Sequence, residues 1–517
     1  MSSFIKQNKI PLLLSTFFSI ITFLTISHYG ITWDEPYYYE SGVNYIHWIQ
    51  NPLMSTIDQV WGLTDKHPPF YKFLAGITHA IFSSQLHLLN DIDAFRSVNI
   101  LFVFLATYII YKFSLLLKLN NKTALFVSSV FFFTPRVFFE THLATLDFPI
   151  TALWLLVIYC YLKGMENTKW ILVSAVFLGF AFLTKITSVL ILFVIIIYWS
   201  FSFFDELLYF VEQRRFIFSH FLFLAKKIIP IVVLSPIVTF LFWPWLWSDT
   251  IEKLEQYILF HSSHFKVPVY YFGTTYNQAP WHYPLILTLI TLPLIILFPF
   301  FIGLLEIIIK RNKLLFFLFI NAALPIVIAS LPNIPKYDGV RLFLPIFPFI
   351  CLIAGIGIQR LMSISKEQTF QIALSSFVLI AFIYTLYTSI VKIHPYQSSY
   401  YNELIGGIDG ATKAGFETEY WGNAYKALLP WINDQKDKAF WVPLSYDAFT
   451  MYKKIGLLKD DIVISPTRHN SEYLILLSRQ GFFDSDSLLW SYYYYEKLVS
   501  TAKLSKTNLV GIYKIKR

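Results

Sequence analysis

Long apolar segments recur along the first three quarters of this chain, and they constrain its fold more than any other feature. Each segment is close to the ~20 residues that a helix needs to cross a bilayer. Hydrophobic residues make up 56% of the chain and charged residues only 14%, whereas ordinary globular proteins are about 25% charged. The sequence therefore predicts a polytopic α-helical membrane protein and excludes a soluble enzyme.

Eleven apolar segments qualify as transmembrane helices. We place them at residues 10–28, 95–117, 123–140, 148–163, 170–185, 187–204, 229–246, 284–308, 314–331, 341–359 and 370–391. Most Lys and Arg residues of this region cluster at one set of helix ends, which the positive-inside rule assigns to the cytoplasm. We expect a cytoplasmic N-terminus, an uncleaved signal anchor in the first span, and a short interfacial helix at 70–82.

Charged residues become denser after residue 391. Residues 392–517 hold 29 charged residues in a mixture of both signs. We therefore expect a transmembrane domain at 1–391, with a first external loop at 29–94, and a soluble domain at 392–517. Alternating apolar and charged stretches in the tail predict an α/β or α+β domain, and an odd number of spans places it outside the cytoplasm.

The formal net charge of +9 does not point to nucleic acid. The basic residues lie between apolar segments instead of forming one patch, so membrane topology explains them. We expect membrane lipids and no nucleic acid among the partners. The two cysteines, Cys160 and Cys351, each fall inside a predicted span, which leaves neither a disulfide framework nor a cysteine metal site.

Two external loops carry acidic residues at the membrane surface. The first reads GITWDEPYYYESG and holds Asp34 and Glu35; the second reads THLATLDFP and holds Asp147. A carboxylate partly shielded by aromatic rings has a raised pKa and can serve as a general base. The alternative for the first pair is a solvated turn that caps a helix, and for Asp147 it is helix capping.

Cationic residues lie on the same predicted face. Lys66 and His67 precede a Pro-Pro break in TDKHPPFYK, where two cations could meet a phosphate or simply form a loop-to-helix joint. Lys185, His282, Lys336 and Arg341 fall at outer ends of spans. Arg341 is the strongest candidate, since its guanidinium can bind phosphate in bidentate fashion, and Lys185 is the second. The alternative for each is snorkelling to the interface.

Several motifs together resemble a known superfamily. They are WDEP after the first span, HPPFYK in the same loop, LDFP opening the fourth span, LTK at 183–185, YNQAPWHYP at 276–284 and KYDGVRLFLP at 336–345. In their order along the chain and their shared predicted side of the membrane, these motifs resemble those of GT-C glycosyltransferases that use a lipid-phosphate sugar donor. The likeness is greatest to the protein O-mannosyltransferase and lipid A aminoarabinose transferase groups. The likeness covers about 400 residues and says little about 430–517.

This resemblance implies a reaction on the extracytoplasmic face. A sugar on polyprenyl phosphate would move to an acceptor hydroxyl with inversion at the anomeric carbon. Asp34 would act on the acceptor, with Glu35 or Asp147 shaping the site, and the cations named above would hold the donor phosphate. The acceptor could be a lipid, a glycan or a protein, and the donor sugar stays open. The resemblance favours a bacterial inner membrane.

A metal site and a different function remain open alternatives. His261 and His264 are three residues apart in HSSHF and could share a divalent metal ion with a carboxylate, but the sequence fixes no third ligand, and a surface pair is favoured. No other cofactor is expected. The rival function is a transporter or flippase of a lipid-linked substrate. We favour an enzyme, because the acids concentrate in two external loops and no inverted repeat is visible.

Overall fold

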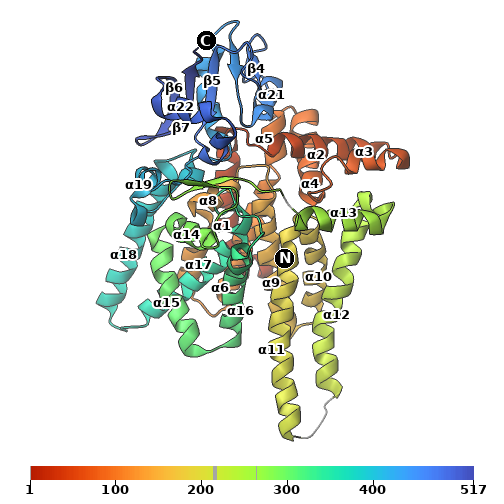
Figure 1. Ribbon diagram of the computed structural model, residues 1–517. Coiled ribbons are helices and arrows are strands. Elements are labelled where there is room, and N and C mark those ends of the chain that lie inside the picture. The colour runs from red at the N-terminus through yellow and green to blue at the C-terminus, as the bar shows by residue number, and fades with distance from the viewer. Residues whose placement is uncertain (1, 214–217, 264, 517) are drawn as a thin grey trace.

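The computed structural model describes residues 2–213, 218–263 and 265–516. A bundle of long helices forms the body, and a mixed sheet from the C-terminal part of the chain lies at one end of it (Figure 1).

The helices of the first half are α1 (Ser2–Thr25), α2 (Glu35–Gln50), α3 (Ile57–Trp61), α4 (Phe70–His79), α5 (Asp91–Arg96), α6 (Asn99–Leu116), α7 (Asn121–Phe132), α8 (Pro135–Glu140), α9 (Asp147–Glu166), α10 (Lys169–Phe182), α11 (Val189–Gln213) and α12 (Phe218–Leu241). The later helices are α13 (Thr250–Ser262), α14 (Tyr283–Thr291), α15 (Leu294–Lys310), α16 (Lys313–Ser330), α17 (Phe347–Met362), α18 (Gln368–Leu386), α19 (Gly407–Lys413), α20 (Leu429–Asn433), α21 (Tyr446–Lys454) and α22 (Ser487–Tyr495).

Each predicted span coincides with a helix or a pair of helices. Within the described residues, six helices are long and apolar enough to cross a membrane, and the pair α14–α15 adds a seventh if it counts as one bent span. The shorter apolar helices include α10 and the first part of α11. The chain is thus an integral membrane protein, and the figure of eleven spans stays a prediction.

Two predicted spans are broken where proline interrupts the helix. The segment 123–140 forms α7 and α8, because Pro135 begins a new helix after the extended residue Thr134. The segment 284–308 forms α14 and α15, which meet at an angle of 120°, with Pro293 directly before α15. Proline lacks the backbone donor that would continue the preceding helix, and this explains both breaks. The apolar pattern does not show them, because the segments are apolar on both sides of each proline.

The C-terminal part of the chain contains a five-stranded sheet with the order β4-β3-β5-β7-β6. Its strands are β3 (Ala439–Trp441), β4 (Val463–Ser465), β5 (Tyr473–Leu477), β6 (Leu498–Leu504) and β7 (Thr507–Lys514). β3 pairs in parallel with β4 and β5, while β7 pairs antiparallel with β5 and β6. A separate hairpin joins β1 (Val269–Tyr271) and β2 (Thr274–Tyr276).

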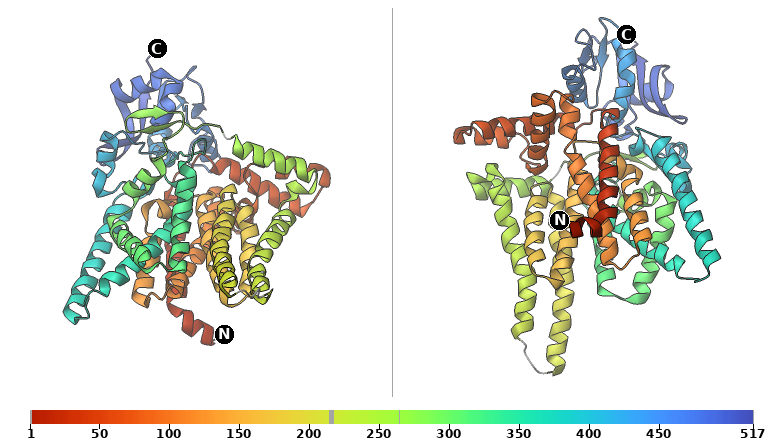
Figure 2. Two further views of the ribbon diagram at one scale, coloured as in Figure 1. Left: turned by 60° about the horizontal axis from the view of Figure 1, so that its bottom comes forward. Right: turned by 180° about the vertical axis from the view of Figure 1, so that it is seen from behind.

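One end of the bundle gathers most of the non-spanning structure. The short helices α2–α5, helix α13 and the C-terminal sheet all lie at this end, and α11 and α12 reach furthest toward the other end (Figures 1 and 2). Helix α4, in the segment expected to lie at the interface, packs on α2 and α5. The predicted external loops therefore share one end of the molecule with the sheet.

Candidate active site

Asp34 and Asp147 each stand at the start of a helix without capping it. Asp34 directly precedes α2 and makes no side-chain capping hydrogen bond. Asp147 is the first residue of α9, where no side chain caps the helix. Both carboxylates instead face the same cation, so helix capping does not account for either acid.

Arg341 is the centre of this arrangement. Its Nη1 lies 3.4 Å from Asp34 Oδ2 and 3.5 Å from Asp147 Oδ2. Its other contacts are shorter, because Nη2 and Nε lie 2.8 and 3.0 Å from Asp338 Oδ2. The guanidinium is thus held firmly by one carboxylate and loosely by two others. Arg341 begins the 3-10 segment Arg341–Ile346, which leads into α17.

Lys185 completes the charged cluster from the loop after α10. Its Nζ donates to Asp147 Oδ1, and the two side chains are 11% and 2% exposed. Asp147 therefore sits between two cations, Lys185 and Arg341. The structure brings together the first two phosphate-binding candidates and two of the three acids expected from the sequence.

The C-terminal part of the chain contributes two further side chains. The Trp421 ring lies 4.3 Å from the Arg341 guanidinium, within the range of a cation–π contact. Arg479 Nη2 lies 2.5 Å from Asp338 Oδ1. Sequence reasoning placed no candidate in the tail and did not single out Asp338. In KYDGVR, Asp338 stands three residues before Arg341, and Asp338 and Gly339 both adopt the left-handed conformation of a tight turn. The Asp-Gly pair is a turn signal in the sequence that could have identified Asp338.

A buried acid orients Trp421 from its other side. The Trp421 Nε1 donates to Glu140 Oε1 at 3.2 Å, and Thr145 donates to the second Glu140 oxygen at 2.9 Å. Trp421 therefore links α8 to the guanidinium of Arg341. An acid at the end of a long apolar segment was the available sequence signal for Glu140.

Glu35 does not join the cluster. Both side chains of the Glu35–Arg96 pair are 0% exposed, and two contacts of 2.6 Å join them in a bidentate arrangement. Glu35 also accepts hydrogen bonds from the backbone amides of Thr32 and Ala144 at 2.9 and 2.8 Å. Its acceptor positions are used within the protein, so the structure corrects the expectation that Glu35 shapes the site directly.

The other phosphate candidates lie apart from the cluster or have other partners. Lys66 pairs with Asp65 at 2.6 Å and lies 5.7 Å from the Trp245 ring. Burial and the nearby Lys72 lower the pKa of His67 well below its usual value, so the ring is neutral at neutral pH. These two residues are therefore not the pair of free cations that the sequence suggested.

Lys336 and His282 also have local partners. Lys336 donates to the backbone carbonyls of Leu331 and Ile334 at 3.0 and 3.1 Å, and burial lowers its pKa. The His282 Nδ1 lies 2.8 Å from the Tyr271 hydroxyl. Lys336 and Tyr337 line a cavity of about 270 Å³, and the Tyr337 ring lies 5.3 Å from the Arg341 guanidinium. Lys336 therefore lies near the cluster, but its ammonium group is bound to backbone carbonyls and not to the acids of the cluster.

Of the candidate metal pair, only His261 lies in the part of the chain that the structure describes. His261 Nε2 lies 3.1 Å from the backbone oxygen of Lys66, and His264 lies outside the described residues. Among the described residues, no group of three or more His, Cys, Asp or Glu side chains could hold a metal ion.

The electrostatics of the cluster suit Asp34 to proton transfer. Desolvation raises the pKa of Asp34, Arg341 lowers it, and the neighbouring Asp147 and Asp338 raise it. Its side chain keeps 32% of its surface exposed, compared with 2% for Asp147. Asp34 is therefore the more accessible acid, and it has an elevated pKa.

Comparisons with known proteins bear on the family and the fold of the chain. Residues 66–247, about a third of the chain, match the sequence model of a family described as dolichyl-phosphate-mannose-protein mannosyltransferase. The apo structure of ArnT from Cupriavidus metallidurans matches with a TM-score of 0.50 and 12% identity, covering 97% of each chain. The chain has the GT-C fold.

Other solved structures match similarly. The apo oligosaccharyltransferase of Archaeoglobus fulgidus matches with a TM-score of 0.50 and 10% identity, covering 91% of this chain and 69% of that one. ArnT from Cupriavidus metallidurans bound to undecaprenyl phosphate matches with a TM-score of 0.48 and 12% identity, covering 97% of each chain. A search of curated proteins finds no significant match.

These findings confirm the expected fold class and the expected resemblance to GT-C glycosyltransferases. The two activities named among the matches, mannosyl transfer to protein and oligosaccharyl transfer, are both glycosyl transfers. The expectation of a membrane glycosyltransferase is borne out, and the transporter alternative finds no support.

Proposed function

We propose that this chain transfers a sugar from a polyprenyl-phosphate donor to an acceptor hydroxyl, with inversion, at the end of the bundle that carries the C-terminal sheet. The observation that carries the proposal is the convergence of Asp34 and Asp147 on Arg341, with Lys185 paired to Asp147, from four separate parts of the chain. The positive-inside distribution makes this end extracytoplasmic, and the resemblance favours a bacterial inner membrane.

Arg341 and Lys185 are suited to hold the donor phosphate. A phosphodiester that loses its sugar gains negative charge, and preorganised cations stabilise that charge as it develops. The 3.4 Å contact between Arg341 and Asp34 is the looser kind, and Asp338 keeps the guanidinium in place. In our proposal the phosphate replaces Asp34 at Nη1 and so frees that carboxylate.

Asp34 then acts as the general base. Its carboxylate takes the proton of the acceptor hydroxyl while the hydroxyl oxygen attacks the anomeric carbon. The bond between that carbon and the phosphate oxygen breaks, and polyprenyl phosphate leaves with the bonding electrons. Because Arg341 lowers the pKa of Asp34, displacement of Asp34 from Arg341 makes it a stronger base when the donor is bound.

Asp147 and several residues outside the cluster have supporting roles in this proposal. Asp147 pairs with Lys185 and contacts the same Nη1 of Arg341 that Asp34 contacts. Glu35 acts as a positioning residue, because its pairing with Arg96 anchors the start of α2, directly after Asp34. We keep the division into a transmembrane part at 1–391 and an outer part at 392–517 as a proposal, in which the outer part contributes Trp421 and Arg479.

The test uses the purified full chain in detergent with a panel of polyprenyl-phosphate sugars and candidate acceptors. Release of free polyprenyl phosphate and the anomeric configuration of the product are measured. We expect release with at least one donor and an inverted product. A retained configuration would contradict the mechanism. Movement of intact donor across proteoliposomes, with no release from folded protein, would contradict the function and support a flippase.

A further inference from the structure

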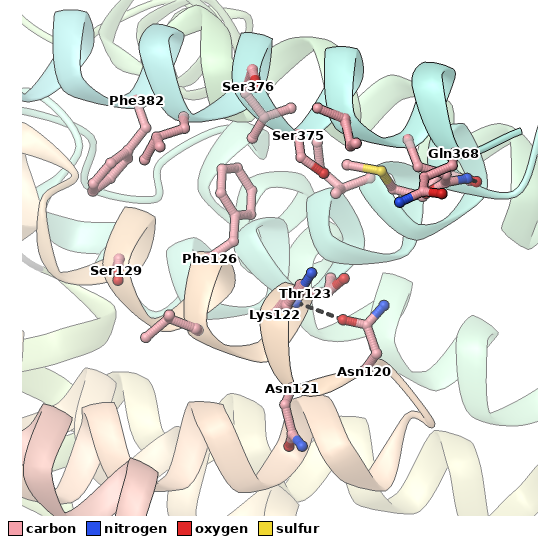
Figure 3. Close-up of a pocket in the computed structure, with 17 residues that line it drawn as sticks. Asn120, Asn121, Lys122, Thr123, Phe126, Ser129, Gln368, Ser375, Ser376 and Phe382 are labelled. Carbon is pink, nitrogen blue, oxygen red and sulfur yellow. Dashed lines mark hydrogen bonds between the residues drawn. The ribbon is translucent and has the colours of Figure 1, made fainter.

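A groove separates α18 from the bundle, far from the charged cluster. It has a volume of about 880 Å³ and lies between α7 and α18, with the last turns of α17 also lining it (Figure 3). None of the α18 residues is buried, although the helix is apolar along its length. The side of α18 that lines the groove is therefore open to a bound molecule.

The lining of the groove changes from polar to apolar along its length. Asn120, Thr123 and Gln368 lie near one end, and Phe382 lies at the other (Figure 3). Phe126 projects into the space between the two helices, Ser375 and Ser376 lie along the middle of the groove, and Ser129 lies at the same end as Phe382. A molecule with a polar head and apolar chains matches this gradient.

The polar end is also rich in cations. Lys118 lies in the turn between α6 and α7, Lys122 lies in the first turn of α7, and Lys366 lies in the turn between α17 and α18. All three are exposed and form no salt bridge with the part of the chain that the structure describes. Glu367 is the one carboxylate in segments 117–123 and 359–371 of the sequence. The excess positive charge calls for an anionic ligand.

The polar end lies at the opposite end of the bundle from the charged cluster. Helix α17 leads away from the segment that begins with Arg341, and its 16 residues span about 24 Å before it reaches Met362 at the groove. The basic residues at this end assign it to the cytoplasmic face by the positive-inside rule. A ligand that binds here is thus distinct from a donor bound at the cluster.

We propose that this groove is a binding site for an anionic glycerophospholipid of the cytoplasmic leaflet. The phosphate lies near Lys122 and Lys366, the serine hydroxyls face the ester groups, and the acyl chains follow Phe126, Leu379 and Phe382. A protein helix fits the groove less well, because the lining of the groove includes Gln371 and Ser375, and the lysines at its mouth form no salt bridge among the described residues. The proposal does not depend on the transfer reaction.

Lipid retention measured by native mass spectrometry tests the site. The purified full chain is equilibrated with equal amounts of phosphatidylglycerol and phosphatidylcholine in detergent. We expect the chain to retain phosphatidylglycerol preferentially, and Lys122→Gln/Lys366→Gln to lower this preference by about fivefold per lysine. Lys169→Gln/Lys226→Gln removes the same charge at exposed positions of the same predicted side and should keep the preference.

A photoreactive residue identifies the occupant directly. With p-benzoylphenylalanine in place of Ser376, illumination of membranes should yield a phospholipid adduct on the chain. Equal retention of the two lipids by the unmodified chain, or an unchanged preference in the double variant, would overturn the proposal. An adduct with a protein would also overturn it, since a partner helix would then fill the groove.

Discussion

Two arginines of this protein bind carboxylates in different ways. Arg96 meets Glu35 through two contacts of 2.6 Å in a fully buried pair, and its remaining donors reach backbone oxygens of Tyr29 and Gly30 at 3.1 and 2.6 Å. Arg341 contacts three carboxylates, and its distances to Asp34 and Asp147 are long, at 3.4 and 3.5 Å. The Arg96 pair is closed and fully buried, whereas two of the three carboxylates at Arg341 are held only by long contacts.

The difference shows how adjacent acids take on separate tasks. Asp34 and Glu35 are neighbours in the sequence, yet one is 32% exposed in the cluster and the other is 0% exposed in a closed ion pair. A closed, fully hydrogen-bonded pair cannot accept a proton from a substrate, while a loosely held, accessible carboxylate can. We therefore expect mutations at the two sites to affect stability and activity differently.

The largest effect on stability is expected from Glu35→Gln. The change leaves Arg96 as a buried charge without its partner, which costs about 3–5 kcal/mol. Thermal unfolding in detergent should show a large fall in Tm. Glu40→Gln alters an exposed acid on the same helix and should shift the unfolding free energy by no more than about 0.5 kcal/mol. Equal Tm values for the two variants would contradict a closed, stabilising pair.

Arg341→Lys tests the open site. Lysine keeps the charge but loses the planar fork that contacts three carboxylates and, in our proposal, the phosphate. We expect kcat to fall by about 10²–10³-fold, as on loss of one preorganised transition-state donor. Arg360→Lys, near the other end of the same helical segment, should keep activity near that of the unmodified chain. Retained activity in Arg341→Lys would remove Arg341 from the mechanism.

Arg479→Gln should have a smaller effect, because Arg479 acts through Asp338. Loss of a charged hydrogen bond worth about 1.5 kcal/mol is expected to lower kcat by about tenfold with little change in the donor KM. Arg468, an exposed arginine of the tail that contacts a backbone oxygen, provides the control Arg468→Gln. A lower Tm with unchanged kcat would indicate a purely structural role.

The smallest expected change is in the pH dependence of kcat/KM. Asp34 must be ionised to act as a base, so activity should fall as the pH drops through its pKa. Because burial raises this pKa above its usual 3.8, the fall should begin at higher pH than for an exposed aspartate. Arg341 lowers the pKa, so the residual activity of Arg341→Gln should show its acid limb at still higher pH. An acid limb at the same pH in both proteins would contradict the claim that Arg341 lowers the pKa of Asp34.

The sequence predicted the fold class and much of the cluster, for physical reasons. Apolar length reports membrane spans, and acids at span ends are costly unless they have a task. This reasoning found Asp34, Asp147, Lys185 and Arg341. It could not separate Asp34 from Glu35, because successive residues at the start of a helix point about 100° apart and the partners of each come from distant segments.

The remaining site residues depend on tertiary contacts. Trp421 and Arg479 come from the tail and meet Arg341 and Asp338 across long stretches of chain. No local periodicity encodes such a meeting. The breaks at Pro135 and Pro293 were visible as prolines, but a proline in an apolar segment can also leave a span intact. These features required the structure.

The most direct test of the account is the kcat of Asp34→Asn, measured beside its Tm. Asparagine preserves the shape of the side chain and cannot take the proton. We predict that polyprenyl phosphate release falls by about 10²–10⁴-fold, while the Tm stays close to that of the unmodified chain and far above that of Glu35→Gln. Release close to that of the unmodified chain, from folded Asp34→Asn protein, would contradict the claim that Asp34 is the base.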